Sequence, residues 1–415
     1  MNSKEGNEAS EFGGLAQAAA PARTGGGSFL LVGDVSEALT TIARRAAHAS
    51  GDKLFREASV PEALAWIESN ATRPTAIGLA MDGEGSARRA VALRESFALA
   101  GVPVIGLVRD LNDLSFEEAF ASGIDEVCGY DEALLARRLR LLGEVDPTNV
   151  KRLDSTVVVA EPDREMRLLI GRVFRDAGYA VAFAADQDET LRQSLEPKTV
   201  AVIVSAAMAL DGDDLLAVRA RTEGCHVPWI VNSPPKEMPS FLRLSLKAAV
   251  SGANVTVHDA FSAPVALLFV TNELLNKPFQ DGRRSVRLLY GTAVRFRLAG
   301  RSNEDVGYIY NISEGGMYVR TLAPPARWDE LWIEFVPPRT DRLVHLDATC
   351  VWVRKFGPAG TASVPPGFGV ELTGGSKADL GRYERSYASY QDERQASRES
   401  IMPPALELPP VVIPR

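Results

Sequence analysis

The chain has 415 residues, of which 46% are hydrophobic and 24% are charged, and its formal net charge is −8 at pH 7. This length exceeds what one hydrophobic core supports and predicts two or three domains. The acidic balance argues against a general nucleic-acid-binding protein. No apolar run approaches the roughly 18 residues of a membrane-spanning helix, and the N-terminus lacks the apolar segment of a signal peptide. We therefore expect a cytoplasmic protein without membrane insertion.

No constellation of residues in the sequence indicates catalysis or metal binding. Neither the cysteines nor the histidines have the spacing of metal ligands, and an odd number of isolated cysteines argues against a disulfide framework. These residues are Cys128, Cys225 and Cys350, and His48, His226, His258 and His345. Catalytic triad order, a Walker loop and paired carboxylates are also missing. We therefore expect no enzyme activity, no catalytic residue, no metal site and no cofactor.

Residues 1–27, rich in Gly, Ala and acidic residues, are predicted to be a disordered leader. From residue 28 to residue 146, short apolar runs alternate with amphipathic stretches, which is typical of parallel strands joined by helices. Strands are expected at Phe29–Val32, Leu54–Glu57, Ala76–Met81, Val104–Val108 and Glu126–Cys128. Helices are expected at Glu37–His48, Pro61–Glu68, Ala87–Ala98, Phe116–Ala121 and Glu132–Leu142.

The same alternation recurs from residue 154 to residue 276, after a joint at residues 146–149. Strands are expected at Thr156–Ala160, Val200–Val204 and Pro228–Val231, and a helix is expected through Arg167 and Phe174. The fragment Val102–Ile105 is similar to Val227–Ile230, and Ser122–Gly123 is similar to Ser251–Gly252 at a comparable offset. We interpret the two segments as a duplicated α/β unit.

Both units resemble the receiver domains of response regulators, which have a flavodoxin-like, doubly wound fold. A receiver needs paired acids after its first strand, a phosphoacceptor Asp at the end of its third, and a Lys after its fifth. In the first unit only Asp34 follows the first strand. Asp82 lies two residues after Ala80, the expected strand end, and Tyr130 stands near the Lys position.

The second unit departs from the receiver pattern in a similar way. Glu161 and Asp163 follow its first strand, Ser205 ends its third, and His258 stands where the Lys is needed. Without a carboxylate nucleophile no acyl phosphate forms. We interpret both units as degenerate receivers that dock proteins or dimerise. The alternative is a response regulator phosphorylated at Asp82 or Asp34, with the C-terminal region as its output.

From residue 290 the pattern changes to short strands separated by turns, which predicts a small antiparallel β-barrel. The strands are expected around Val294–Leu298, Tyr308–Tyr310, Met317–Val319, Leu331–Val336, Leu343–Val353 and Phe368–Leu372. Four aromatic residues at strand spacing are expected in the core: Phe296, Trp332, Phe335 and Trp352.

A helix at Ala378–Gln395 follows the barrel and carries Tyr383, Tyr387 and Tyr390. We expect it to lie against the barrel, with the tyrosines in packing or partner contacts. Residues 397–415 form a Pro-rich segment that is expected to be extended or disordered.

Two motifs flank the first strands of this region. Arg283, Arg284 and Arg287 form a basic arm, and Asn311, Ser313 and Gly316 form a polar corner between two apolar runs. Arginine pairs in bidentate fashion with phosphate or with a guanine edge, and it stacks on purine rings. Asn and Ser side chains can add hydrogen bonds, and Gly permits a close backbone approach. Together they suit a planar, doubly anionic ligand.

The two motifs resemble the signature of the PilZ family of bacterial cyclic di-GMP receptors, RxxxR followed by (D/N)xSxxG. The resemblance covers residues 278 to 392, and we assign residues 278–396 to a domain of this type. It implies that Arg283 and Arg287 bind guanine and phosphate and that Arg284 adds a stacking contact. It also implies that Asn311 and Ser313 donate or accept hydrogen bonds, and that Gly316 keeps the corner open.

The resemblance implies a bacterial signalling protein that binds cyclic di-GMP and relays the signal by protein contact. Partners in motility, adhesion or polysaccharide production are typical of the family, and the sequence does not choose among them. We expect ligand binding to change how the barrel sits on the α/β units. The alternative is an adaptor whose barrel no longer binds the ligand.

Overall fold

The computed structural model describes residues 26–70, 73–83, 85–96, 101–111, 116–144, 154–210, 226–233, 255–258, 264–275, 285–357 and 364–401, with Leu215, Arg219 and Thr222. The predicted leader up to residue 25, the joint at residues 146–149, Cys225, Arg283, Arg284 and the tail from residue 402 lie outside the described residues. No helix in these ranges has the length and apolar character needed to cross a membrane.

The first unit is a five-stranded parallel sheet with strand order β2-β1-β3-β4-β5. Its strands are β1 (Ser28–Val32), β2 (Lys53–Glu57), β3 (Ala76–Ala80), β4 (Val104–Val108) and β5 (Glu126–Gly129). Its helices are α1 (Glu37–Ser50), α2 (Val60–Ser69), α3 (Ser86–Arg94), α4 (Phe116–Ala121) and α5 (Glu132–Gly143). Strands β1, β3 and β4 are buried along their whole length because helices cover both faces of the sheet. The order is that of the flavodoxin-like fold, as predicted.

Local chemistry explains where the helices of this unit begin. Ser36 and Asp131 accept hydrogen bonds from the first turns of α1 and α5. Ser59 and Glu62 form a capping box at the start of α2, with Pro61 in its first turn. The predicted helix at Ala87–Ala98 was too long, since α3 ends at Arg94.

The second unit repeats the first, with strand order β10-β9-β8-β6-β7. Its strands are β6 (Thr156–Ala160), β7 (Ala180–Phe183), β8 (Thr199–Ser205), β9 (Trp229–Asn232) and β10 (Val255–His258). Its helices include α6 (Arg164–Asp176), α7 (Gln187–Ser194), α8 (Ala206–Leu210) and α11 (Val265–Leu275). The similar fragments at residues 102–105 and 227–230 enter β4 and β9, which occupy equivalent places in the two sheets. Strand β7 and helix α7 were not predicted, because β7 is short and only half-buried.

The third unit is a closed antiparallel barrel with strand order β11-β12-β13-β16-β15-β14. Its strands are β11 (Leu288–Leu298), β12 (Asp305–Ser313), β13 (Gly316–Arg320), β14 (Glu330–Phe335), β15 (Val344–Arg354) and β16 (Gly367–Gly375). Helix α12 (Lys377–Ile401) follows and extends past the predicted helix end at Gln395. Tyr383, Tyr387 and Tyr390 on this helix join the barrel core, so the predicted packing of the helix is confirmed.

The predicted aromatic core of the barrel is half right. Phe296 and Phe335 are buried, whereas Trp332 faces outward under the Arg297 guanidinium and Trp352 is 43% exposed. A register shift between Cys350 and Trp352 explains the second error. The bulge reverses the inward and outward alternation of β15, and a strand pattern read from sequence assumes that the alternation continues.

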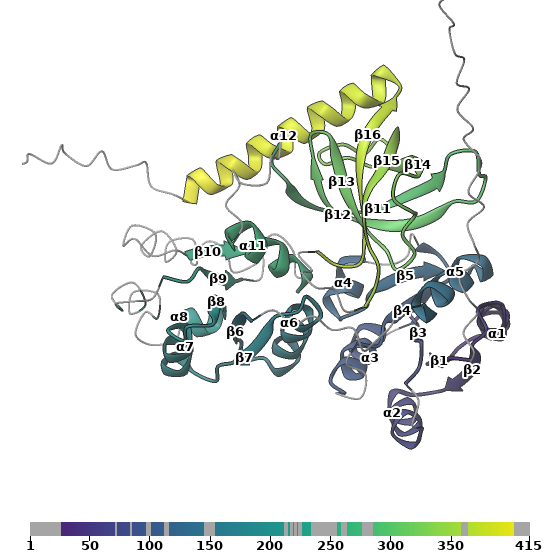
Figure 1. The fold of residues 1–415 in the computed structure, drawn as a ribbon, viewed down its shortest axis with the longest axis horizontal. Coiled ribbons are helices and arrows are strands. Elements are labelled where there is room, and N and C mark those ends of the chain that lie inside the picture. The colour runs from purple at the N-terminus through teal and green to yellow at the C-terminus, as the bar shows by residue number, and fades with distance from the viewer. Residues whose placement is uncertain are drawn as a thin grey trace, which may run out of the picture.

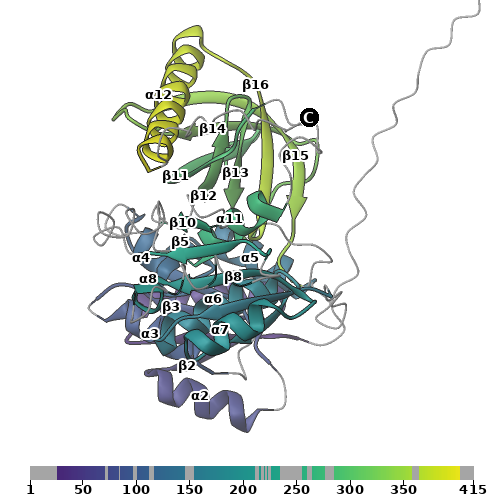
Figure 2. The ribbon, with the colours of Figure 1, turned by 90° about the vertical axis from the view of Figure 1, so that its left-hand side faces the viewer.

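The barrel sits on both α/β units, which lie side by side beneath it (Figure 1). Strand β5 and helices α4 and α5 of the first unit face the barrel, and so does helix α11 of the second (Figure 2). Helix α12 runs across the far side of the barrel, away from both sheets.

Candidate functional site

The predicted polar corner is the hairpin between β12 and β13. Ser313 at the end of β12 is paired with Gly316 at the start of β13, so Glu314 and Gly315 form the turn. The Ser313 hydroxyl donates a hydrogen bond to the Gly316 carbonyl oxygen at 3.2 Å. A β-carbon on Gly316 would lie 2.1 Å from the carbonyl oxygen of Val370 on β16. Gly316 is therefore required for the pairing of β13 with β16, whatever it does for a ligand.

The strand register brings the end of the basic arm to this corner. Arg287 is exposed and directly precedes β11. At the start of β11, Leu288 is paired with Ile312 and Leu289 with Asn311. Arg287 therefore lies beside the end of β12, where the turn begins. The barrel thus joins the last arginine of the first motif to the corner formed by the second.

Helix α12 holds the corner side of this site. The Tyr383 hydroxyl donates to the Ser313 carbonyl oxygen at 2.6 Å and lies 3.3 Å from that of Gly316. Burial raises the pKa of Tyr383 above its usual range, so the hydroxyl keeps its proton at neutral pH and remains a donor. Tyr383 is 1% exposed. The turn is therefore anchored to the helix at its two ends.

The same helix holds the arm side. The Tyr387 hydroxyl donates to the Val286 carbonyl oxygen at 2.7 Å, and the Tyr390 hydroxyl donates to that of Leu289 at 2.8 Å. These two bonds bracket Arg287 along the backbone. The sequence placed the tyrosines on one helix face but did not connect them with the site, since their partners lie far away in the chain. Their spacing of four and three residues was the available signal.

Asn311 occupies an unusual position between two irregularities. Register shifts interrupt the pairing of β12 with β11 and with β13 next to this residue. Bulges of this kind redirect side chains and are common beside functional sites. Asn311 is 3% exposed, yet its side-chain amide makes no hydrogen bond with any residue in the described ranges. An amide that is nearly buried and has no partner among the described residues is available to a ligand.

Replacing Tyr383 with phenylalanine is expected to lower the free energy of unfolding by about 1 kcal/mol, because the buried Ser313 carbonyl loses a donor. Urea unfolding followed by fluorescence measures the change. Tyr308→Phe is the matched control, because the Tyr308 hydroxyl makes no hydrogen bond within the described part of the chain. Equal stability of the two variants would show that the Tyr383 contact does not stabilise the corner.

The sequence from residue 281 to residue 388 matches the PilZ domain family. Residues 281–388 are a PilZ domain. No curated protein matches this chain. The family match ends within α12 at residue 388, so it includes the barrel together with Tyr383 and Tyr387, whereas Tyr390 lies two residues beyond it.

Three solved structures illustrate the similarities. One is the PilZ domain with c-di-GMP of YcgR from Escherichia coli, at 18% identity over 28% of this chain and 98% of that chain, with a TM-score of 0.22. Another is the Bacillus subtilis inhibitor of motility MotI/DgrA, at 18% identity over 28% of this chain and 52% of that chain, with a TM-score of 0.23. This chain therefore covers about half of that protein. A probable two-component system response regulator/GGDEF domain protein is 18% identical over 60% of this chain and 99% of that chain, with a TM-score of 0.27. Likenesses at such TM-scores carry no functional argument.

In the first receiver-like unit, the acidic residues lie where the sequence indicated. Strand β3 ends at Ala80, and Asp82 follows it as an exposed residue. One Asp82 oxygen accepts a hydrogen bond from the Arg109 backbone N–H at 3.1 Å, and the other accepts from the Tyr130 hydroxyl. Asp82 therefore contacts the residue near the Lys position without being at the strand end that a phosphoacceptor occupies.

In the second unit the corresponding polar groups are engaged at helix starts. A Glu161 oxygen accepts from the Asp163 backbone N–H at 3.1 Å, and Asp163 caps α6 through the Met166 N–H at 2.8 Å. The Ser205 hydroxyl oxygen accepts from the Met208 N–H at 3.2 Å. Among the described residues no group of acids, histidines and cysteines could hold a metal ion.

We expect acetyl phosphate to leave both α/β units unlabelled, because neither places a carboxylate at the end of its third strand. Incubation with Mg²⁺ and acetyl phosphate, followed by intact-mass and peptide mass spectrometry, measures the labelling. A bona fide receiver domain serves as the positive control. A phosphoryl group on Asp82 or Asp34 would contradict this expectation and favour a phosphorylation-driven regulator.

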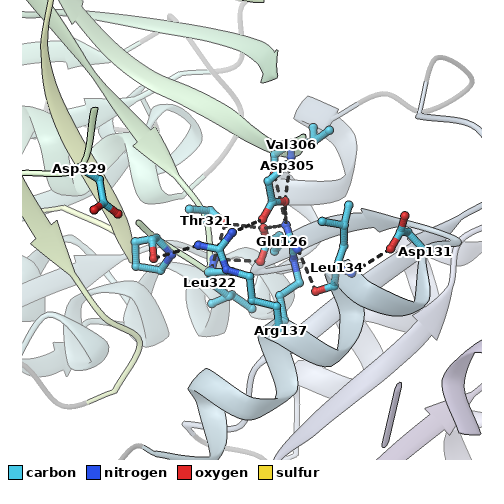
Figure 3. Close-up of polar contacts among 12 residues, drawn as sticks. Glu126, Asp131, Leu134, Arg137, Asp305, Val306, Thr321, Leu322 and Asp329 are labelled. Atoms are coloured by element: carbon cyan, nitrogen blue, oxygen red, sulfur yellow. Dashed lines mark hydrogen bonds and ion pairs between the residues drawn. The ribbon is translucent and has the colours of Figure 1, made fainter. Parts of the chain in front are cut away.

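A buried ion-pair cluster joins the first unit to the PilZ domain (Figure 3). Arg138 on α5 is 1% exposed, and its guanidinium donates to Glu126 Oε1 and to Asp305 Oδ1, each at 2.8 Å. Arg137 donates to Asp305 Oδ2 at 3.0 Å. Burial alone would lower the pKa of Arg138, but the carboxylates of Asp305 and Glu126 outweigh it and hold that pKa above the usual value. The cluster connects α5 and β5 to the start of β12.

Glu126 also binds the end of β13. Its Oε1 accepts from the Thr321 hydroxyl at 2.7 Å, and its Oε2 accepts from the Leu322 backbone N–H at 2.8 Å (Figure 3). Because β5 is an edge strand, this contact covers an edge that would otherwise be open to pairing. The first unit is therefore docked to its own PilZ domain through this edge.

Proposed function

We propose that the PilZ domain binds cyclic di-GMP at the junction of Arg287 with the corner of Asn311, Ser313 and Gly316, together with Arg283 and Arg284. The observation that carries the proposal is the placement of Arg287 beside the corner. The β11–β12 register and the tyrosines of α12 produce this placement.

The chemistry of the residues matches that of the ligand. Cyclic di-GMP has two phosphate charges and two guanines, and arginine forks recognise both groups. The Asn311 amide, which has no hydrogen-bond partner in the part of the chain that the structure describes, supplies a donor group and an acceptor group for a guanine edge. Glu314 in the turn is exposed and acidic, so the arginines must outweigh its repulsion of the phosphates. Two or three charge-assisted contacts of about 1.5–3 kcal/mol each lead to micromolar affinity after the ordering cost.

We further propose that the chain acts as a receptor that passes the signal to a protein partner, with no catalytic step and no cofactor. The buried cluster around Arg138 holds the barrel on the first unit, so a large separation of the two would be costly. Helix α12 contacts both halves of the site and lies on the face away from the α/β units. A partner that reads the state of this helix would therefore sense the ligand.

Calorimetric titration of the full chain with cyclic di-GMP tests the proposed function, and cyclic di-AMP is the matched control because it keeps both phosphates and changes the bases. We expect micromolar binding of the guanine ligand and much weaker binding of the adenine ligand. No heat and no thermal stabilisation with cyclic di-GMP would leave an adaptor whose barrel does not bind this ligand.

A further inference from the structure

A second cationic site lies where the two α/β units and the PilZ domain meet. A small cavity of about 60 Å³, partly open to solvent, is lined by α6, the turn before β5, the start of α11 and two barrel strands. Its charged lining residues are Asp125, Arg172, Asp176, Arg320 and Arg354. None of them belongs to the proposed cyclic di-GMP site.

The Asp125 carboxylate forms ion pairs with the arginines that come from the α/β units. It accepts from Arg172 at 2.9 Å and from Arg94 at 2.5 Å. Burial alone would raise the pKa of Asp125, but Arg172 and Arg94 lower it to about 2. Asp176 forms an ion pair with Arg172 at 3.3 Å. The two carboxylates of the cavity are thus engaged with two arginines.

Within the described residues the two barrel arginines form no ion pair with a carboxylate. Burial lowers the pKa values of both and outweighs the opposing effects of Asp125, which raises the pKa of Arg320, and of Asp176, which raises that of Arg354. Arg354 is 8% exposed, and its one hydrogen bond runs to the Asp176 carbonyl oxygen at 3.4 Å. Arg320 is 9% exposed, donates to the Ile124 carbonyl oxygen at 3.0 Å, and lies over the Phe120 ring at 3.9 Å. The Nε atoms of both are buried without a partner. Burial lowers the pKa of Arg320 to about 10.

The barrel register places these guanidinium groups as a pair. Arg320 on β13 and Arg354 on β15 are both paired with Gly367 on the intervening strand β16. Residues paired across neighbouring strands project to the same face, so the arginines flank the glycine on one face, with Cα atoms about 10 Å apart. A β-carbon on Gly367 would lie 2.0 Å from the Val319 carbonyl oxygen, so the close approach of β13 requires this glycine. The space beside the two arginines is the cavity that both of them line. Two buried cations with unused donors on either side of a gap attract an anion.

We propose that this junction cavity binds a small oxyanion of the phosphate class, held between Arg320 and Arg354 with Arg172 at its edge. Phosphate offers several acceptor oxygens, so it can satisfy both arginine forks at once, whereas chloride cannot. The anion would join the PilZ domain to the second unit, because its ligands come from β13, β15 and α6.

The test uses the full chain and inorganic phosphate as the probe, titrated by calorimetry at constant ionic strength against sodium chloride. We expect a dissociation constant of about 1 mM or lower, weakened about 10- to 100-fold in Arg354→Gln and in Arg320→Gln. Arg295→Gln, an exposed arginine on β11, and Arg287→Ala are controls that should bind phosphate like the wild type. Titration with guanosine 5′-monophosphate distinguishes a site for free phosphate from one for a phosphate ester.

Thermal unfolding supplies a second readout. Phosphate should raise the melting temperature of the wild type and leave that of Arg354→Gln unchanged, while in phosphate-free buffer the variant should be at least as stable as the wild type. Wild-type protein that binds no phosphate, or an Arg354→Gln variant that binds it equally well, would overturn the proposal. Loss of phosphate binding in Arg287→Ala alone would assign the anion to the cyclic di-GMP site and would also overturn it.

Discussion

The Arg287→Ala variant is expected to lose cyclic di-GMP binding while keeping its fold. Arg287 is exposed and precedes β11, so the barrel core does not depend on its side chain, and stability should change by less than about 0.5 kcal/mol. A charge-assisted contact is worth about 1.5–3 kcal/mol, so its removal weakens binding by about 10- to 150-fold. From a micromolar starting point this places the affinity near or beyond the limit of calorimetry.

The matched control for this experiment is Arg295→Ala. Arg295 is an exposed arginine on β11 that forms an ion pair with Glu334 at 3.5 Å, so Arg295→Ala removes one positive charge from the same domain. The control should lose little affinity, because Arg295 is not part of the proposed site, although the net charge of the domain changes equally in both variants. Unchanged affinity in Arg287→Ala would remove this residue from the site. Equal losses in the two variants would indicate a general electrostatic effect instead of a specific contact.

The Asp305→Ala variant is expected to unfold more easily by about 3–5 kcal/mol, because Arg138 keeps its charge in a buried position with only Glu126 left to balance it. Arg137 loses its ion-pair partner as well. Urea unfolding measured by circular dichroism follows the change, and the transition that includes the PilZ domain should move to lower denaturant.

Asp347→Ala is the control for this prediction, since Asp347 is an exposed aspartate on strand β15 of the same barrel. It should cost less than about 0.5 kcal/mol. The triple variant Asp305→Leu with Arg138→Met and Glu126→Gln should recover much of the loss, because all three buried charges of the cluster are then replaced by neutral groups. A loss in Asp305→Ala no larger than that in Asp347→Ala would show that the cluster does not stabilise the docked arrangement.

The sequence predicted the elements of this protein well where one residue pattern decides the outcome. The apolar runs at residues 104–108 and 156–160 became strands, and the amphipathic stretches at residues 37–48 and 132–142 became helices. The polar corner of Ser313 and Gly316 became a hairpin, because pairing across a two-residue turn is a local event. The errors occurred where a bulge interrupted the pattern, as at Trp352, or where a short strand had a weak one, as at Ala180–Phe183.

The candidate site likewise combines local features, which the sequence predicted, with long-range contacts, which it did not predict. The residue types of the site and the spacing of its two motifs could be identified from the sequence, since they are properties of short segments. The roles of Tyr383, Tyr387 and Tyr390 could not be predicted. Each hydroxyl donates to a carbonyl oxygen that is about 70 to 100 residues away in the sequence. Only the folded barrel brings helix α12 against both motifs.

Which charges are paired was also decided by the tertiary structure. Arg138, Arg320 and Arg354 are ordinary arginines in the sequence. Nothing near them distinguishes Arg138, which forms ion pairs with two carboxylates, from the other two, which form none within the described residues. An ion pair depends on distance in space and on burial, and a linear pattern contains neither quantity. The sequence therefore predicted the three folded units and the two motifs of the candidate site. The docking of the units and the cationic cavity between them depend on long-range packing, which the sequence pattern does not contain.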